Sequence, residues 1–503
     1  RAMVATPGNQ ILLKEKALLW DLSTSTAAAT EPFASRGVAD YTVVQAEEGK
    51  PNGTFLIEKP ASNPNYKANV EMFAKSFDGN RNKTYATWQY FGSPVKSANR
   101  DQLPLESTWV RKYNRTLNVP NSDEKWEDVT TGTLTQGEAY EITQPKPANY
   151  RFIGELNTGD FTFNVNGMAS ATNYQDMNIL ANPYTGAMNI EKLDFSGATA
   201  ADKVVYLFNT GSRKDWIANN GANATINTGV TEGQYTKAIP ANLAGYVNGM
   251  PKDIPSLSSF MVKSTGAGTL KYRYADLVNV VATENRAPER RFHSLAVDVE
   301  SAKSADRLWL VQAEGTTDRY DNGWDGEKIF APGETALYAM QDRSYQVTTT
   351  ETIGETKLGF VPAEGEQNYK LTFHIDGADG AQEYTLLDKR TGLTRAIHDG
   401  DTYEFTAAQG DAAHRFTILG NGAKATADQR GFQISADLRR NFTVKNFTDE
   451  PAEALVFDAA GKIQARFKVE AGSENTGTVV MPGAYVVRVS NKVTTLTQRF
   501  VMP

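Results

Sequence analysis

Apolar and polar residues alternate along much of this chain. In residues 369–376 the apolar side chains occupy the odd positions and the polar side chains the even ones, and residues 462–469 repeat that pattern. A period of two places one set on each face of a β-strand. A register slip of one residue would expose the apolar set, at a cost of about 1.5–3 kcal/mol for each large side chain. Because long helical periodicity is nearly absent, the pattern predicts an all-β chain.

Polar segments rich in turn residues divide the sequence into blocks. The segments 282–290 and 420–428 are polar and are typical of linkers. The blocks on either side are long enough to bury their own cores, so we expect several β-sandwich domains in tandem. The expected parts are an N-terminal lead-in over 1–60, which either precedes the first β domain or belongs to it, a β-sandwich over 61–285, a second over 286–422 and a last module over 423–503.

The last module contains many short strand patterns in few residues. About seven such strands favour an immunoglobulin-like β-sandwich. In the strand that follows Gly483, Tyr485, Val487 and Val489 fall on one face. The predicted strands cover residues 432–434, 442–446, 454–457, 462–469, 478–480, 484–489 and 493–501.

Composition narrows the class of protein. The chain has 503 residues, with 52 Lys and Arg against 59 Asp and Glu. This mild acidity, without a dense basic stripe, argues against a nucleic-acid partner. Cysteine is absent, which excludes disulfides, cysteine-ligated zinc and thiol chemistry. No apolar run approaches 18 residues, so no transmembrane segment is expected. The chain starts with Arg1 and has no apolar signal-peptide core, so we interpret it as a processed or truncated product.

An acidic loop is the best candidate for a metal site. Asp318, Asp321 and Asp325, with Glu327 beyond them, offer carboxylates on a glycine-bearing loop, which is the chemistry that calcium requires. The spacing is not that of an EF-hand, and Asp321 begins a sequence that also favours a plain tight turn. Calcium is the one cofactor that the sequence suggests.

Aromatic residues gather in the first block. Trp88, Trp109 and Trp126 could form a platform that stacks on sugar rings, as in glycan-binding modules. The alternative is that these rings fill the space between two sheets.

Catalytic motifs are missing from the sequence. None of His293, His374, His398 and His414 pairs with another at a metal-ligand spacing. The chain has no Gly-x-Ser-x-Gly elbow, no phosphate-binding loop and no His-Glu-x-x-His helix. We therefore expect a protein that is not an enzyme, and a glycoside hydrolase or peptidase is the least favoured interpretation.

Three segments of the last module carry a family resemblance: residues 442–446, 455–461 and 482–489. Together they resemble the C-terminal sorting domain of type IX secretion substrates from Bacteroidetes. The resemblance implies that a type IX secretion apparatus reads this β-sandwich. The most specific part is the strand whose motif residues are Gly483, Tyr485, Val487, Arg488 and Val489. The chain departs from the commonest form at Thr494, Thr495 and Thr497, where a basic, aliphatic strand is frequent.

Two further segments resemble large surface proteins of the same bacteria. Residues 177–184 are similar to their "NLIGNPY" segment, with Ala181 in place of the usual glycine, and residues 318–328 are similar to their "fDngyDaeK" loop. The resemblance implies an exported, non-catalytic, adhesin-like protein at the outer-membrane surface or outside the cell. For such a protein we expect a glycan or a host surface as ligand. The alternative is a glycan-binding accessory module.

Overall fold

A computed structural model provides the structure of this chain. The predicted linker 282–290 and nearly all of 420–428 lie outside the described residues, as does most of the lead-in 1–60. The structure describes residues 11–13, 18–21, 42–47, 52–57, 66–76, 87–119, 122–167, 176–210, 234–239, 247, 249–278, 292–331, 333–377, 383–420, 431–437, 439–448, 450–492 and 495–502.

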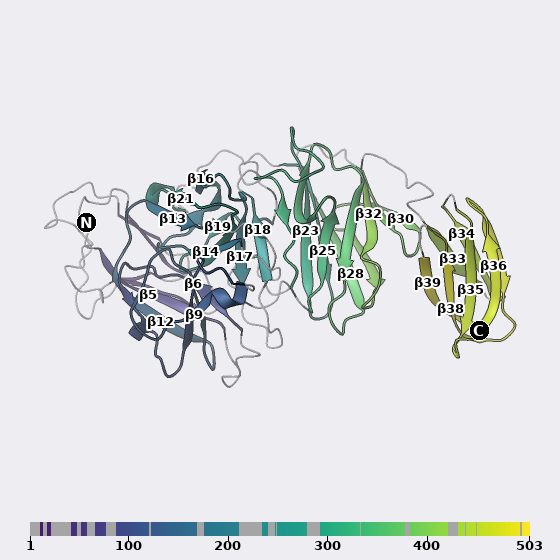
Figure 1. Cartoon of the computed structure of the whole chain (residues 1–503), viewed down its shortest axis with the longest axis horizontal. Helices are drawn as coiled ribbons and strands as arrows, with labels where there is room; N and C mark the ends of the chain where they lie inside the picture. The colour runs from purple at the N-terminus through teal and green to yellow at the C-terminus, as the bar shows by residue number, and fades with distance from the viewer. Residues whose placement is uncertain are drawn as a thin grey trace. The chain divides into compact units, whose positions relative to one another are not determined.

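The prediction of an all-β chain is confirmed (Figure 1). Helical structure in the described residues is confined to short 3-10 turns, at Arg100–Gln102, Ser122–Lys125, Ile190–Lys192 and Tyr274–Asp276. Within the same residues, no helix has the length and apolar character needed to cross a membrane.

The chain divides into two compact units. The first contains Arg1–Phe292, Lys303–Ala305 and Tyr320–Pro332, and the second contains the remaining residues up to Pro503. The segment Tyr320–Pro332 thus belongs to the first unit, although the residues on both sides of it belong to the second.

The first unit is built from several small sheets. Buried and exposed residues alternate along β12 (Ala148–Glu155) and β13 (Phe161–Val165). These segments form strands because the alternation places the apolar side chains on one inward face and the polar ones in water. Four sheets of this unit have three or four strands. The first has the order β1 (Ile11–Leu13), β3 (Thr42–Val44), β5 (Lys67–Ala74), β12 (Ala148–Glu155), and the second has the order β6 (Gln89–Phe91), β11 (Tyr140–Thr143), β8 (Trp109–Tyr113), β9 (Trp126–Asp128). The third has the order β13 (Phe161–Val165), β21 (Gly268–Tyr272), β16 (Asp194–Gly197), and the fourth has the order β14 (Met177–Ala181), β20 (Ser259–Lys263), β17 (Val205–Asn209), β18 (Gln234–Ala238). The described residues of this unit also form three two-stranded sheets: β2 (Leu18–Asp21) with β4 (Thr54–Ile57), β7 (Ala98–Asn99) with β10 (Thr133–Leu134), and β15 (Met188–Asn189) with β19 (Asp253–Ile254).

One long sheet that folds over itself forms the first part of the second unit. The ring of Phe360 lies 4.9 Å from that of Tyr369 and 5.1 Å from that of Phe405, so distant parts of the sheet face each other across a shared core. The strand order is β30 (Leu393–Ile397), β29 (Tyr384–Asp388), β32 (His414–Gly420), β27 (Thr356–Val361), β25 (Ala336–Met340), β26 (Ser344–Thr350), β23 (Ala305–Gln312), β22 (Ser294–Glu300), β28 (Asn368–Asp376), β31 (Thr402–Thr406). The short strand β24 (Gly326–Glu327) lies in the segment that belongs to the first unit.

Residues 431–502 form a two-layer sandwich, drawn in yellow in Figure 1. Its core is made of side chains from its own strands, among them Phe442, Val456 and Val487. The first layer has the order β33 (Phe432–Ala436), β34 (Asn441–Asn446), β37 (Glu474–Thr478), and the second has the order β36 (Ile463–Val469), β35 (Ala452–Asp458), β38 (Gly483–Ser490), β39 (Thr495–Met502).

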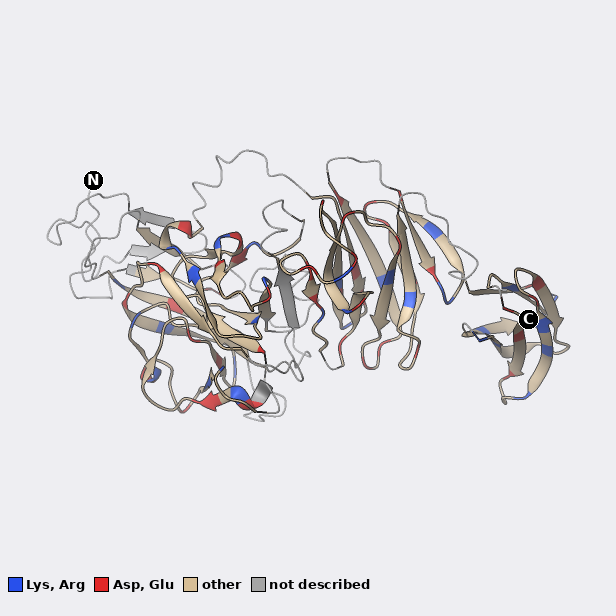
Figure 2. Ribbon diagram, turned by 45° about the horizontal axis from the view of Figure 1, so that its top comes forward, with Lys and Arg blue, Asp and Glu red and all other residues tan. Residues whose placement is uncertain are grey.

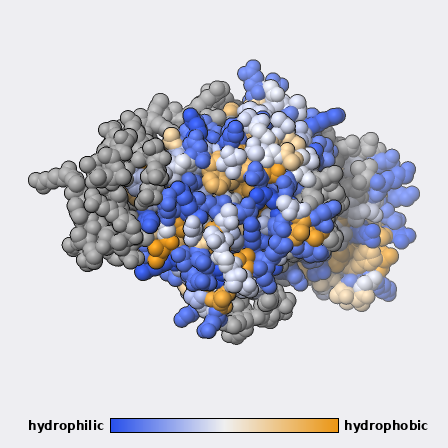
Figure 3. Space-filling model, turned by 60° about the vertical axis from the view of Figure 1, so that its left-hand side comes forward, coloured by the Kyte–Doolittle hydropathy of each residue, from blue (hydrophilic) through white to orange (hydrophobic). Residues whose placement is uncertain are grey.

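Charged residues are dispersed over the described surface. Lys and Arg alternate with Asp and Glu on the ribbon without a continuous basic stripe (Figure 2). On the face shown in Figure 3, apolar residues form small patches separated by hydrophilic ones.

Candidate functional site

The predicted sorting motif lies on β38, an inner strand of the last sandwich. Tyr485, Val487 and Val489 are buried, whereas Arg488 is exposed, so the predicted sharing of one face is confirmed. The Tyr485 hydroxyl donates a hydrogen bond to the carbonyl of Met481 at 2.6 Å. Gly483 has φ of +150°, a conformation that side chains rarely adopt. The apolar half of the motif is therefore structural, and Arg488 is its solvent-facing part.

Exposed apolar residues flank the start of this strand. Val480 is 83% exposed and Met481 is 66% exposed in the turn before β38. Val501, which pairs with Ala484 of β38, is 84% exposed. Sequence analysis placed residues 478–480 in a strand, but the strand ends at Thr478, because the paired segment is the polar Glu474–Thr478.

The three candidate glycan-binding tryptophans do not form one platform, because Trp126 is buried apart from the contacting pair of Trp88 and Trp109. Trp126 is buried, with its ring 5.0 Å from those of Tyr90 and Tyr113. Trp88 and Trp109 are half-buried and meet edge to face at 4.6 Å. Trp126 therefore fills the core of the first unit, while Trp88 and Trp109 keep part of their surface open to solvent.

A pocket of about 280 Å³ adjoins Trp109. The indole Nε1 of Trp109 donates a hydrogen bond to Asp128 Oδ1 at 2.7 Å, which holds the ring in place. Leu105 is 52% exposed in this pocket. The remaining lining residues are Arg100, Glu106, Ser107, Thr108, Val110, Val129 and Thr130.

Arg100 organises the wall of this pocket. Its guanidinium donates to the carbonyls of Leu103, of Thr108 at 3.1 Å and of Val129 at 2.8 Å. Arg100 is only 1% exposed, and burial lowers its pKa. Sequence analysis missed this residue, because one arginine in a polar stretch carries no periodic signal.

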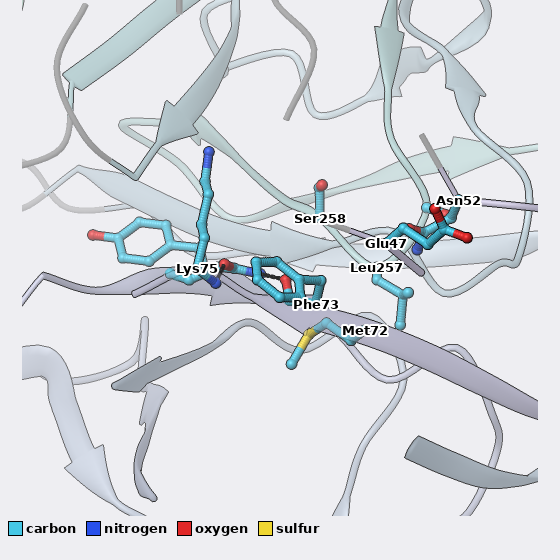
Figure 4. A pocket seen from close by; sticks show the side chains of 10 residues that line it. Glu47, Asn52, Met72, Phe73, Lys75, Leu257 and Ser258 are labelled. Carbon is cyan, nitrogen blue, oxygen red and sulfur yellow. Dashed lines mark hydrogen bonds between the residues drawn. The ribbon is translucent and has the colours of Figure 1, made fainter. Parts of the chain in front are cut away.

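A second pocket in the first unit is much smaller. It encloses about 30 Å³, enough for about two water molecules. Figure 4 shows the labelled Lys75, Phe73 and Leu257 around it. The backbone NH of Lys75 donates to Gln89 Oε1 at 2.7 Å, and Gln89 Nε2 donates to the Phe73 carbonyl at 3.1 Å. Gln89 is thus held by local hydrogen bonds, and the pocket is too small for an organic ligand.

The predicted calcium loop adopts a turn held by its own residues. Asp325 is fully buried, and its Oδ2 accepts a hydrogen bond from the NH of Asp321 at 2.8 Å. Asp318 is exposed. In the described part of the chain, no three acidic or histidine side chains are grouped to hold a metal ion. The calcium site stays a prediction, without support from this geometry.

The same loop is anchored to the body of the first unit. Asn322 Oδ1 accepts from the NH of Lys203 at 2.8 Å, and Asn322 Nδ2 donates to the Ala201 carbonyl at 3.1 Å. Lys263 Nζ lies 2.8 Å from Glu327 Oε2 and 3.4 Å from Asp176 Oδ2.

Lys263 and Asp176 are both buried, so their charges depend on each other. Burial raises the pKa of Asp176, although Lys263 opposes the shift. Burial by itself would lower the pKa of Lys263, but Asp176 and Glu327 outweigh it, and the pKa lies above the ordinary value. This charge cluster fixes the loop and was not predicted, because its three members are far apart in sequence.

Comparison with known proteins identifies the family to which this chain is similar. Residues 36–419 match a family model described as "Domain of unknown function (DUF8693)". A relative, the minor fimbrium subunit Mfa5 of Porphyromonas gingivalis, is 31% identical over 484 residues. The aligned region covers 92% of this chain and 38% of that protein. The solved structure titled "Biofilm associated protein - BSP domain" aligns with 86% of this chain and 98% of its own at 10% identity, with a TM-score of 0.13.

Similarity to a fimbrium subunit indicates an extracellular or cell-surface protein, which confirms the location predicted from the sequence. The family match extends over more than half of the 503 residues and includes the Trp109 pocket. This chain therefore belongs to the family described as Domain of unknown function (DUF8693).

Proposed function

We propose that this chain is a non-catalytic, adhesin-like component of a bacterial surface assembly, and that residues 423–503 are its sorting domain. In this proposal a type IX secretion apparatus recognises the last sandwich and exports the rest of the chain with it. The relative Mfa5 is a fimbrium subunit, which supports a structural role in a surface assembly.

The observation that carries the sorting proposal is the construction of the last sandwich. Among the described residues, the members of its core cluster all come from residues 432–502. A segment with its own core can fold and be recognised as a unit. The motif strand β38 presents Arg488 outward while Tyr485, Val487 and Val489 hold the fold.

Deletion of residues 423–503 tests this function in a Bacteroidetes host that has a type IX apparatus. The truncated chain should accumulate in the periplasm, in a form that resists limited proteolysis, because the preceding sheets have their own cores. The full-length chain should be labelled by antibody on intact cells. Undiminished surface labelling of the truncated chain would refute the sorting role.

Two substitutions separate recognition from folding. Val487→Asp places a carboxylate in the core and should unfold the sandwich and abolish export. Arg488→Ala leaves the core intact, so a loss of export in a chain that still folds would assign recognition to the exposed face of β38.

A further inference from the structure

We propose that the pocket beside Trp109 binds one ring of a neutral saccharide, with the indole as the stacking surface and the carboxylates of Asp128 and Glu106 as hydrogen-bond acceptors. The inference rests on the proposed adhesin-like function and names the class of ligand for it. Of the three tryptophans considered from the sequence, Trp109 is the one that lines this pocket.

The wall of the pocket is formed before any ligand arrives. Three carbonyls, from Leu103, Thr108 and Val129, converge on the buried guanidinium of Arg100. The Thr108 hydroxyl also donates to the Pro104 carbonyl at 2.7 Å. A wall held in this way loses little conformational freedom on binding, which favours affinity for a small ligand.

The apolar part of the pocket suits the C–H face of a sugar ring. The hydrogen bond from Trp109 Nε1 to Asp128 fixes the indole, and Trp88 meets this ring edge to face at 4.6 Å. Leu105 adds exposed apolar surface. An aromatic ring with an apolar neighbour offers dispersion contacts to C–H groups, while polar groups around it determine the orientation.

The polar part of the pocket selects against anionic sugars. The carboxylates of Glu106 and Asp128 can each accept hydrogen bonds from sugar hydroxyls, and such charge-assisted bonds are stronger than neutral ones. Arg100 is the one cation among the lining residues, and carbonyls already occupy its guanidinium. The Arg111 guanidinium lies 5.1 Å from the centre of the Trp109 ring but is paired with Glu141. A sialic acid or uronic acid would therefore meet the carboxylates of the pocket without a cation that is not already engaged.

The volume limits the ligand to about one ring. Ligand pockets usually enclose about 300–1,000 Å³, and this pocket of about 280 Å³ lies just below that range. For one ring we expect a dissociation constant on the order of a millimolar. Adhesion would then depend on many copies binding at once.

Saturation-transfer NMR on the purified full chain tests the inference. The probes are the methyl glycosides of glucose, galactose and mannose, with the methyl glycoside of sialic acid and methylammonium as alternative ligands. At least one neutral glycoside should receive saturation, and the sialoside and methylammonium should not. No transfer to any neutral glycoside, or equal transfer to the sialoside or to the amine, would overturn the assignment.

Variants locate the binding to this pocket. Trp109→Ala should weaken binding of the responsive glycoside at least tenfold, and Asp128→Asn should weaken it several-fold while keeping an oxygen for the indole. Phe330→Ala removes another aromatic ring, one that is 41% exposed and does not line the pocket, and should leave binding unchanged. Full binding by a folded Trp109→Ala chain would refute the site. Because these measurements use purified protein, their failure is distinct from a failure of sorting in cells.

Discussion

The hydroxyl of Tyr485 donates a hydrogen bond of 2.6 Å to the carbonyl of Met481, four residues earlier. This bond closes the turn that leads into β38. The Tyr485 ring also lies 5.8 Å from Phe442 of the opposite layer. One side chain thus joins the turn, the motif strand and the core of the last sandwich.

Tyr485→Phe removes the hydrogen bond but keeps the ring in the core. We expect the last sandwich to lose about 1 kcal/mol of unfolding free energy. Tyr485→Ala should cost about 3–5 kcal/mol, as truncation of a large buried ring does. Urea unfolding followed by NMR signals of this sandwich would measure both, and equal effects of the two variants would contradict the separate roles of hydroxyl and ring.

Gly359 allows a close aromatic contact inside the second unit. Gly359 pairs with Tyr338 across two strands, and a Cβ at this glycine would lie 2.2 Å from the Tyr338 ring. Gly359→Ala should therefore destabilise this unit by about 1–3 kcal/mol. The matched control is Gly354→Ala, where a Cβ meets no atom within 4 Å and the change should stay within about 0.5 kcal/mol. Calorimetry of both variants checks the difference, and equal melting temperatures would show that the ring moves aside freely.

The charge cluster around Lys263 should be sensitive to loss of its cation. Lys263→Met leaves Asp176 and Glu327 without their shared partner, so we expect a loss of about 3–5 kcal/mol in the stability of the first unit. Lys370→Met breaks the exposed pair with Glu300 and should cost about 0–1 kcal/mol. Urea titration of the two variants makes the comparison. If Lys263→Met lowered the unfolding free energy no more than Lys370→Met does, the charge cluster would not stabilise the loop.

Stability of the second unit should depend on pH through His414. Burial, with help from Lys389 and Lys357, lowers the pKa of His414 from 6.5 to about 4. The unfolded chain therefore binds a proton below pH 6.5 that the folded chain does not bind until about pH 4, so stability falls as pH decreases through that range. With solvent screening of the half-buried ring, we expect about 1–2 kcal/mol from this group.

Two histidine variants isolate this contribution. His414→Gln should flatten the pH dependence of unfolding between pH 6.5 and 4, whereas His398→Gln, at an exposed site, should leave it in place. Urea titrations at several pH values distinguish them, and an unchanged slope in the His414→Gln chain would contradict the predicted shift.

The sequence predicted strands well where alternation was strong. Tyr369, Leu371 and Phe373 are buried as expected from their period of two. The pattern was less informative at the edge of a sheet. Val469 of β36 is fully buried, but Ile463 on the same predicted face is 42% exposed. The outer strand β36 has an irregular register with β35 between Ala465 and Ile463, and the extra residue there breaks the period of two.

Sites formed by residues that are distant in sequence could not be predicted from the sequence. Trp109 and Asp128 are brought together by the pairing of β8 with β9. Arg100 donates its hydrogen bonds to backbone carbonyls, which every residue type has, so the sequence does not indicate its partners. In the acidic loop, by contrast, two residues that are close in sequence lie in different environments: Asp318 is exposed and Asp325 is buried. Spacing alone cannot distinguish those outcomes.

A transfer experiment tests the central claim, that the last sandwich is sufficient to direct export. Residues 423–503 are fused to an unrelated periplasmic protein in a Bacteroidetes host that has a type IX apparatus, and antibody labelling of intact cells is measured. The account predicts surface labelling that is lost when Val487→Asp unfolds the sandwich. Retention of the folded fusion in the periplasm, while the native chain reaches the surface of the same cells, would contradict it.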